Sequence, residues 1–179
     1  MLLLTIPAAE LFDDKTQEFI KIPEYRLQME HSLVSLSKWE SKWCKAFLTK
    51  EDKTNEEVID YIKCMTITQN VEPATYLALT KSNIEQIKKY IEAPMTATTF
   101  SEPQKGNSRE IVTSELIYYW MISMNIPMEC QKWHINRLLT LIRICNIKNG
   151  DPKKMSRGDI MRRNAALNAA RRKKLNTKG

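Results

Sequence analysis

Apolar and polar residues alternate in short runs over the first 34 residues, which is the pattern of β-strands with one buried face. Runs of this kind occupy residues 2–6, 10–12, 18–22 and 25–30. Pro7 separates the first two runs, and the polar stretch 13–16 is typical of a turn before the third. The pattern therefore predicts a small β-meander in this N-terminal segment.

From Ser35 onward the apolar positions recur every three or four residues, as they do on one face of an α-helix. Leu36, Trp39 and Trp43 show this spacing first. Thr54 and Glu57 then form a capping-box pattern at the start of a second helix, because a Glu three residues after a Thr can bond back to its backbone. The pattern predicts helices over residues 35–47, 54–65, 81–92, 114–125, 128–149 and 156–175.

Strands at the start and helices afterwards predict an α+β fold that is mainly helical. We expect residues 1–34 and a helical core at 35–150 to form one domain, followed by a basic C-terminal helix at 151–179. Residues 96–100 and 109–113 are also β-prone and are candidates for a hairpin.

Composition excludes several classes of protein. The 179 residues are 42% hydrophobic, which is enough for a packed core, and contain only four glycines, too few for Gly-rich phosphate-binding loops. No apolar run approaches the roughly 20 residues that span a bilayer. The N-terminus lacks the basic segment of a signal peptide, so we expect a protein that stays in the cytoplasm where it is made and does not bind membranes.

Charge is distributed unevenly along the chain. Ten lysines and arginines against two aspartates give residues 151–179 a net charge of +8, which leaves −1 for residues 1–150 out of a total of +7. The basicity is therefore a property of the C-terminal helix, which is either a solvated end or an electrostatic contact with an acidic protein surface or with phosphates. The candidate binding residues are Arg162, Arg163, Arg171, Arg172, Lys173 and Lys174.

Cys130 and His134 are the candidates for chemistry, because residues four apart on a helix face each other, as a thiolate–imidazolium pair requires. A catalytic cysteine also needs an orienting group and an oxyanion hole, and no Gly-rich segment accompanies this pair. We interpret both residues as core and expect no catalytic residue and no enzymatic activity. Four cysteines without a C-x-x-C pair and two histidines also predict mostly buried, reduced thiols, with no metal and no cofactor.

Aromatic side chains at helical spacing are the remaining candidates, either as platforms for stacked bases or as core and interface anchors. We favour core or interface for Trp39, Trp43, Tyr119, Trp120 and Trp133. We also expect Trp133, Leu138, Ile142 and Cys145 to pack against Trp39 and Trp43. The helix at 114–125 is apolar on nearly all sides, and a domain of this size can hardly bury it completely. Part of its surface should therefore contact another chain.

Five stretches of the sequence resemble small proteins encoded in the structural modules of tailed bacteriophages, over most of residues 27–175. They are "EHSLVSLSKWESKW", "PMTATTF", "TSELIYYWMI", "WHINRLLTLIRICNIKN" and "KKMSRGDIMRRNAALNAARRKK". The resemblance implies a tail assembly chaperone or tail accessory component. Such proteins bind the tape measure protein or tail tube subunits before these polymerise. The strands at 1–24 lie outside the resemblance and depart from the largely helical character of tail chaperones.

The expected function is therefore that of a non-enzymatic phage assembly or virion-associated protein that acts by protein–protein contacts. Its expected partners are tail or other virion proteins, including the tape measure protein, or a second copy of the chain. It would act in the host cytoplasm during assembly or remain in the virion. The alternative is a small nucleic-acid-binding protein that uses the basic C-terminal helix.

Overall fold

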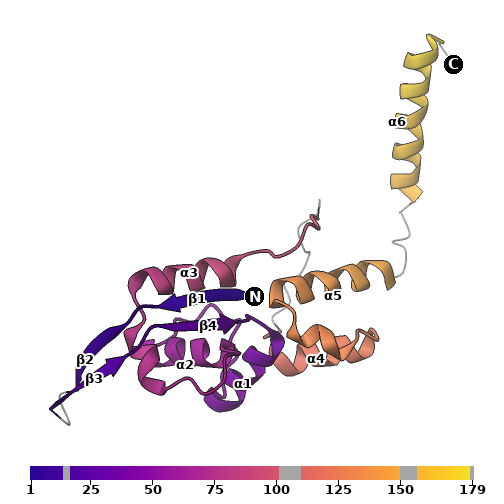
Figure 1. Ribbon diagram of the computed structural model, residues 1–179. Helices are drawn as coiled ribbons and strands as arrows, with labels where there is room; N and C mark the ends of the chain where they lie inside the picture. The colour runs from indigo at the N-terminus through magenta and orange to yellow at the C-terminus, as the bar shows by residue number, and fades with distance from the viewer. Residues whose placement is uncertain (14–16, 101–109, 150–156, 178–179) are drawn as a thin grey trace. The chain divides into compact units, whose positions relative to one another are not determined.

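The computed structural model describes residues 1–13, 17–100, 110–149 and 157–177. The predicted fold class is confirmed: four short strands precede a series of helices, so the protein is α+β and mainly helical (Figure 1). The chain forms two compact units, Met1–Cys145 and Asn146–Gly179, which are described separately below.

The four strands lie within one or two residues of the predicted ones, but they form a single long hairpin and not a meander. They are β1 (Leu2–Ile6), β2 (Ala9–Asp13), β3 (Glu18–Ile22) and β4 (Tyr25–Met29). β1 pairs with β4 and β2 pairs with β3, both antiparallel, and the register does not slip between the two ladders. Pro7 interrupts one arm and Pro23 the other at nearly the same level. A proline has no N–H to donate, so these residues break the ladder without reversing the chain.

One face of the β1–β4 ladder forms the base of the core. Leu4, Ile6, Leu27 and Met29 alternate with exposed residues and are at most 1% exposed. Helices α1 (Leu33–Trp43) and α2 (Asn55–Met65) pack against each other beside β4, and α3 (Lys81–Glu92) runs alongside β1 (Figure 1). The amide of Asn83 on α3 donates to the carbonyl of Thr5 at 2.9 Å, which gives the outer edge of β1 a partner.

Local capping interactions fix where the first helices begin. Thr54 and Glu57 form the predicted capping box of α2. The cap of α1 is Ser32, with Ser35 closing the box as its third helical residue, so the helix begins earlier than predicted. It also ends earlier than predicted. Cys44 adopts a left-handed conformation with φ of 52°, and its backbone N–H donates to the carbonyl of Glu40, which closes the last turn.

Two predictions for the second half of the larger unit are wrong. The helix expected over residues 128–149 is a short 3-10 helix, η2 (Met128–Lys132), followed by a separate helix α5 (Ile135–Asn149). The break occurs because the amide of Ile135 donates to the carbonyl of His31 at 2.7 Å, a tertiary bond that holds the intervening residues extended. The hairpin expected from 96–100 and 109–113 does not form either, since neither 96–100 nor the described 110–113 contains a strand.

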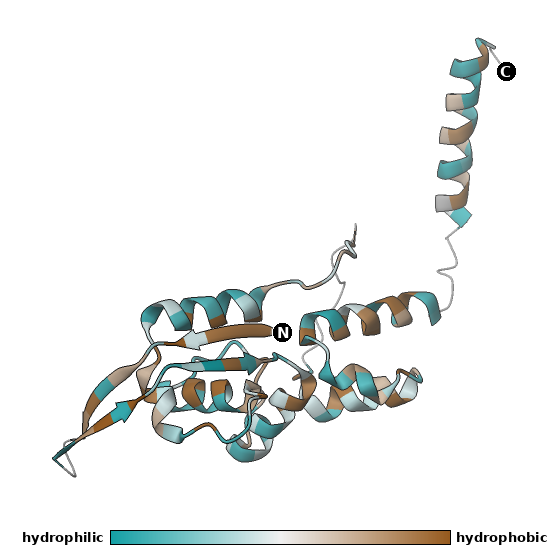
Figure 2. Cartoon of the chain, in the orientation of Figure 1, coloured by the Kyte–Doolittle hydropathy of each residue, from teal (hydrophilic) through white to brown (hydrophobic). Residues whose placement is uncertain are grey.

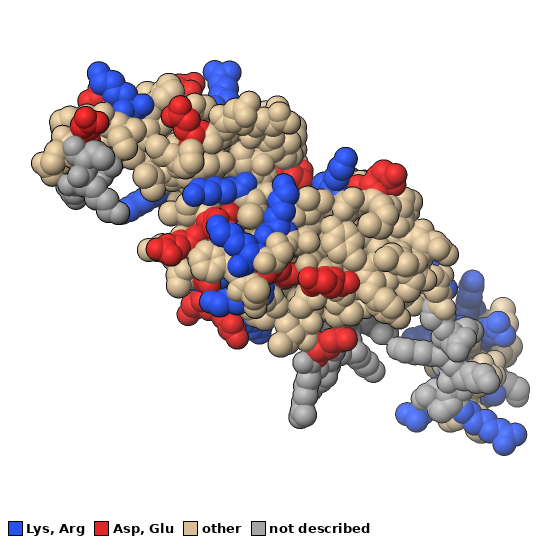
Figure 3. All heavy atoms as spheres, turned by 90° about the horizontal axis from the view of Figure 1, so that it is seen from below, with Lys and Arg blue, Asp and Glu red and all other residues tan. Residues whose placement is uncertain are grey.

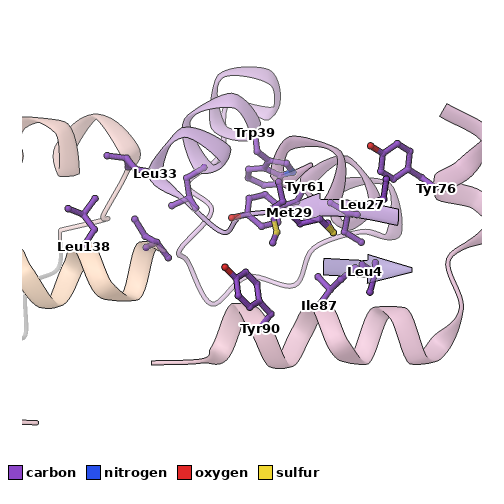
Figure 4. Close-up of a cluster of buried hydrophobic side chains, with 14 of the residues drawn as sticks. Leu4, Leu27, Met29, Leu33, Trp39, Tyr61, Tyr76, Ile87, Tyr90 and Leu138 are labelled. Atoms are coloured by element: carbon purple, nitrogen blue, oxygen red, sulfur yellow. The ribbon is translucent and has the colours of Figure 1, made fainter. Parts of the chain in front are cut away.

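The remaining elements are a 3-10 helix η1 (Pro73–Ala78), helix α4 (Ser114–Ser123) and helix α6 (Arg157–Leu175). The buried side chains of the larger unit gather between the hairpin and the helices, with Trp39, Tyr61 and Met29 near the centre (Figure 4). Leu138 and Ile142 of α5 are buried as predicted, whereas Trp133 and Cys145 are only half-buried.

Candidate interaction surfaces

Both histidines of the chain meet in the core, although 103 positions separate them in the sequence. His31 follows β4 and His134 precedes α5, and their side chains are 2% and 4% exposed. The two rings pack edge to face with centroids 5.0 Å apart. Tyr61 and Tyr90 pack edge-on against them, Tyr61 on His31 and Tyr90 on His134. The sequence pattern does not reveal the burial of His31, because an isolated histidine carries no periodic signal.

Hydrogen bonds define the state of the His134 ring. Its Nε2 lies 3.0 Å from the carbonyl oxygen of Tyr90, which can only accept, so Nε2 carries the proton. Nδ1 accepts the backbone N–H of Asn136 at 3.3 Å. His31 bonds through Nδ1 to the hydroxyl of Tyr61. Burial, together with the neighbouring His134, lowers the pKa of His31 to about 3. Burial likewise lowers the pKa of His134. Both rings are therefore neutral at pH 7.

The Cys130–His134 pair that the sequence offered has no catalytic geometry. Cys130 lies in η2 and His134 in the extended link to α5, so the two are not on one helix. Both nitrogens of His134 are already engaged with backbone groups, so the imidazole has no free lone pair with which to accept a thiol proton. The prediction that both residues are core is confirmed, with Cys130 5% exposed.

The cysteines differ in burial from one another. All four are free thiols: Cys130 is buried, Cys64 and Cys145 are half-buried and Cys44 is exposed, so the expectation of mostly buried thiols is wrong. Burial raises the pKa of the Cys64 thiol, which disfavours a reactive thiolate there. Within the described part of the chain, no group of three His, Cys, Asp or Glu side chains is arranged to hold a metal ion.

Both tryptophans of α1 contribute to the core. Trp39 is 1% exposed, and its indole N–H donates to the carbonyl of Glu57 at 2.9 Å. Trp43 stacks on it with centroids 6.2 Å apart and donates to Asp60 at 2.9 Å. Trp133 is half-buried, and the guanidinium of Arg137 lies 4.1 Å from its ring centroid.

Glu40 is a structural residue that the sequence pattern did not reveal, since a Glu on an amphipathic helix is usually solvated. Its side chain is 7% exposed and bridges two segments. One carboxylate oxygen accepts the N–H of Phe47 at 2.8 Å, and the other accepts the N–H of Ser114, the first residue of α4, at 2.7 Å. A carboxylate at a helix N-terminus is favourable because the first amides have no partner within the helix.

Helix α4 exposes a pair of large apolar side chains on one side. Ile117 and Met121 are fully buried, and Trp120 is half-buried, so the helix is anchored on one side. On the other side Tyr119 and Ile122 are 63% and 67% exposed, and their spacing of three residues makes them neighbours. The hydroxyl of Tyr118 donates to Gln131 at 2.9 Å, which ties α4 to η2. We call Tyr119 and Ile122 the outer face of α4. It exposes one aromatic and one aliphatic side chain on a helix that is held in place by its buried side.

Helix α6, in the smaller unit, has a different character. Each of its side chains that the structure describes is exposed, including all six candidate basic residues. Polar and apolar residues alternate around it without forming an apolar stripe (Figure 2). By contrast, basic and acidic side chains are intermingled on the face of the larger unit that Figure 3 shows. None of the described helices combines the length and apolar character needed to cross a bilayer.

Comparisons with protein-family models, curated proteins and solved structures find no match for this chain.

Proposed function

We propose that the chain is a non-enzymatic assembly protein of a tailed bacteriophage, which binds other virion proteins through the outer face of α4. The observation that carries the proposal is the exposure of Tyr119 and Ile122 on a helix whose opposite side is buried at Ile117 and Met121. Exposed aromatic residues with aliphatic neighbours are typical centres of protein interfaces. The resemblance of the sequence to phage structural-module proteins supports a tail protein as the partner.

The anchoring of α4 matters because a rigid surface binds without the entropic cost of ordering it. Glu40 holds the first amide of α4, and Thr113 caps the helix by accepting the N–H of Leu116 at 3.4 Å. The amide of Ile126 returns to the carbonyl of Met121 at 2.8 Å and fixes the other end. The expected partners are therefore recognised by a preformed patch. The tail tube subunit and the tape measure protein, held before they polymerise, are the first candidates.

The experiment measures the affinity of the full chain for the tail tube and tape measure proteins encoded with it, by biolayer interferometry. The test variant carries Tyr119→Ser with Ile122→Ser. The control carries Ile67→Ser with Leu77→Ser, which are exposed by 51% and 63% and lie outside α4. We expect the tail tube protein or the tape measure protein to bind the wild type and the control with similar affinity. We expect the test variant to bind at least about 30-fold more weakly, since removing two central contacts costs 2 kcal/mol or more.

Equal affinity of the test variant and the control would contradict the proposal. Sedimentation velocity on the wild type and the test variant separates a second possibility. If the outer face of α4 joins two copies of this chain, the wild type sediments as a dimer and the test variant as a monomer, and the proposal of a virion partner at this face fails.

A further inference from the structure

Helix α6 carries its charge in two clusters separated by a slim central segment. Arg157, Arg162 and Arg163 lie toward its start together with one acidic residue, Asp159, and the consecutive residues 171–174, Arg-Arg-Lys-Lys, lie at its end. Between them, residues 164–170 read Asn-Ala-Ala-Leu-Asn-Ala-Ala, with four alanines and no charge. The basic side chains and those of the central segment are all exposed. Nothing in the proposed contact through α4 uses this helix.

We infer that α6 binds duplex DNA by lying in the major groove, with its two basic clusters on the phosphates and its central segment against the base edges. A 19-residue helix is about 28 Å long at 1.5 Å per residue. An α-helix with short side chains fits the major groove, which is about 12 Å wide. The alanines keep the central turns narrow enough to enter it.

The arrangement of charge favours a groove over a flat acidic surface. Successive residues of a helix are turned by about 100°, so the four basic residues 171–174 point in four directions around the axis. A flat protein surface would contact only one of these directions and leave the others in solvent. A groove has phosphates along both walls, so a helix within it meets negative charge on both sides at once.

The central segment also offers side chains suited to bases. Asn164 and Asn168 are four residues apart and therefore lie on the same side of α6. Asparagine can pair with the N6 and N7 atoms of adenine in the major groove through two hydrogen bonds. The alanines beside them permit close approach of the helix backbone. The basic clusters would thus supply most of the affinity, and the two asparagines a modest preference for sites that contain adenine.

The test uses the full chain and fluorescence anisotropy with a labelled 20-base-pair DNA duplex, over a range of salt concentrations. The binding variant carries Arg171→Ala, Arg172→Ala, Lys173→Ala and Lys174→Ala. The control carries Lys50→Ala, Lys81→Ala, Lys88→Ala and Lys89→Ala, which removes the same charge from exposed positions of the larger unit. Because both variants alter only exposed side chains, circular dichroism and tryptophan fluorescence should match the wild type.

We expect the wild type and the control to bind duplex DNA with similar affinity, and the binding variant to lose at least about 30-fold. The slope of log affinity against log salt should fall by about 3–4 in the binding variant, since each lost phosphate contact removes about 0.9. Asn164→Ala with Asn168→Ala should reduce the preference for adenine-containing sites and leave the salt slope unchanged.

Equal DNA affinity of the binding variant and the control would overturn the inference, as would absence of DNA binding by the wild type. An A-form RNA duplex that binds as tightly as DNA would also overturn it, because the major groove of RNA is too deep and narrow to admit the helix. Polyglutamate that displaces the labelled duplex as effectively as unlabelled DNA does would also overturn the inference, because α6 would then bind an acidic protein surface.

Discussion

Acidification should destabilise the larger unit through its buried histidine pair before the carboxylates become involved. His31 has a pKa of about 3 in the folded protein because it is buried beside His134, whereas in the unfolded chain its pKa returns to about 6.5. Between these two values the unfolded state binds a proton that the folded state does not. The contribution of His31 to the free energy of unfolding is therefore at its full value above about pH 6.5 and decreases as the pH falls below it.

The size of this loss follows from the two pKa values. Each pKa unit corresponds to about 1.4 kcal/mol, so His31 alone should remove roughly 2–3 kcal/mol between pH 7 and pH 4.5. His134 adds to the loss in the same direction, because burial lowers its pKa too, although Glu30 and the Tyr90 carbonyl oppose the shift. Such a loss is a substantial part of the 5–15 kcal/mol typical of a folded domain.

The groups around the pair do not obscure the effect. Glu30 accepts the hydroxyl of Tyr90 at 2.5 Å and the amino group of Met1 at 2.9 Å, and Tyr61 and Tyr90 titrate only in the alkaline range. The hydrogen bond from Lys45 lowers the pKa of Glu57 below its usual range. A carboxylate with a lowered pKa loses its contribution only below about pH 4.5. Glu57 therefore does not contribute to the loss between pH 6.5 and pH 4.5.

Urea unfolding followed by tryptophan fluorescence at pH 7.0, 5.5 and 4.5 measures the effect, since Trp39 lies in the same core. The wild type should lose stability across this window, and His31→Asn should lose at least half of that dependence whatever its stability at pH 7. The NMR signals of the two imidazoles give a second measurement, in which the His31 signal should not titrate between pH 8 and pH 5. A wild type equally stable at pH 7.0 and pH 4.5, or a His31 signal with a midpoint near 6.5, would refute the reasoning.

Three further predictions concern single sites and one boundary. Glu40→Ala should lower the free energy of unfolding, measured in urea, by about 3–5 kcal/mol, because it leaves the amides of Phe47 and Ser114 without an acceptor. Glu40→Gln should lower it clearly less. Equal losses in the two variants would show that the carboxylate does not bridge the two amides. Cys130→Ala should leave partner binding within about threefold of wild type in a variant that folds, so a large loss there would restore the cysteine as a functional group. Deletion of residues 150–179 should leave the near-UV circular dichroism and the urea midpoint of the larger unit unchanged, since that unit ends at Cys145.

Local patterns in the sequence were sufficient to place most elements. Alternation located all four strands within one or two residues, and the capping box at Thr54 and Glu57 located the start of α2. The apolar circumference of α4 also indicated an exposed face, which Tyr119 and Ile122 form. These features depend on residues within a few positions of one another, so a periodic pattern records them.

Features that depend on distant residues were not predictable in the same way. The pairing of β1 with β4 brings Pro7 and Pro23 to nearly the same level of the hairpin, whereas a single proline in a sequence equally suits a turn. The break before α5 depends on the carbonyl of His31, more than 100 positions away. The burial of Glu40 depends on the amide of Ser114, 74 positions away. In each case the outcome depends on a contact between residues that are distant in the sequence.

Site-specific photo-crosslinking during infection tests the proposed function most directly. Tyr119→p-benzoylphenylalanine places a crosslinker on the outer face of α4, and Leu77→p-benzoylphenylalanine is the control, because both positions are 63% exposed. After irradiation of cells infected by a phage that encodes this chain, as the proposal requires, mass spectrometry identifies the crosslinked proteins. The proposal predicts an adduct between position 119 and a tail protein, and none of that protein at position 77. The same adducts from both positions, or only host proteins at position 119, would contradict it.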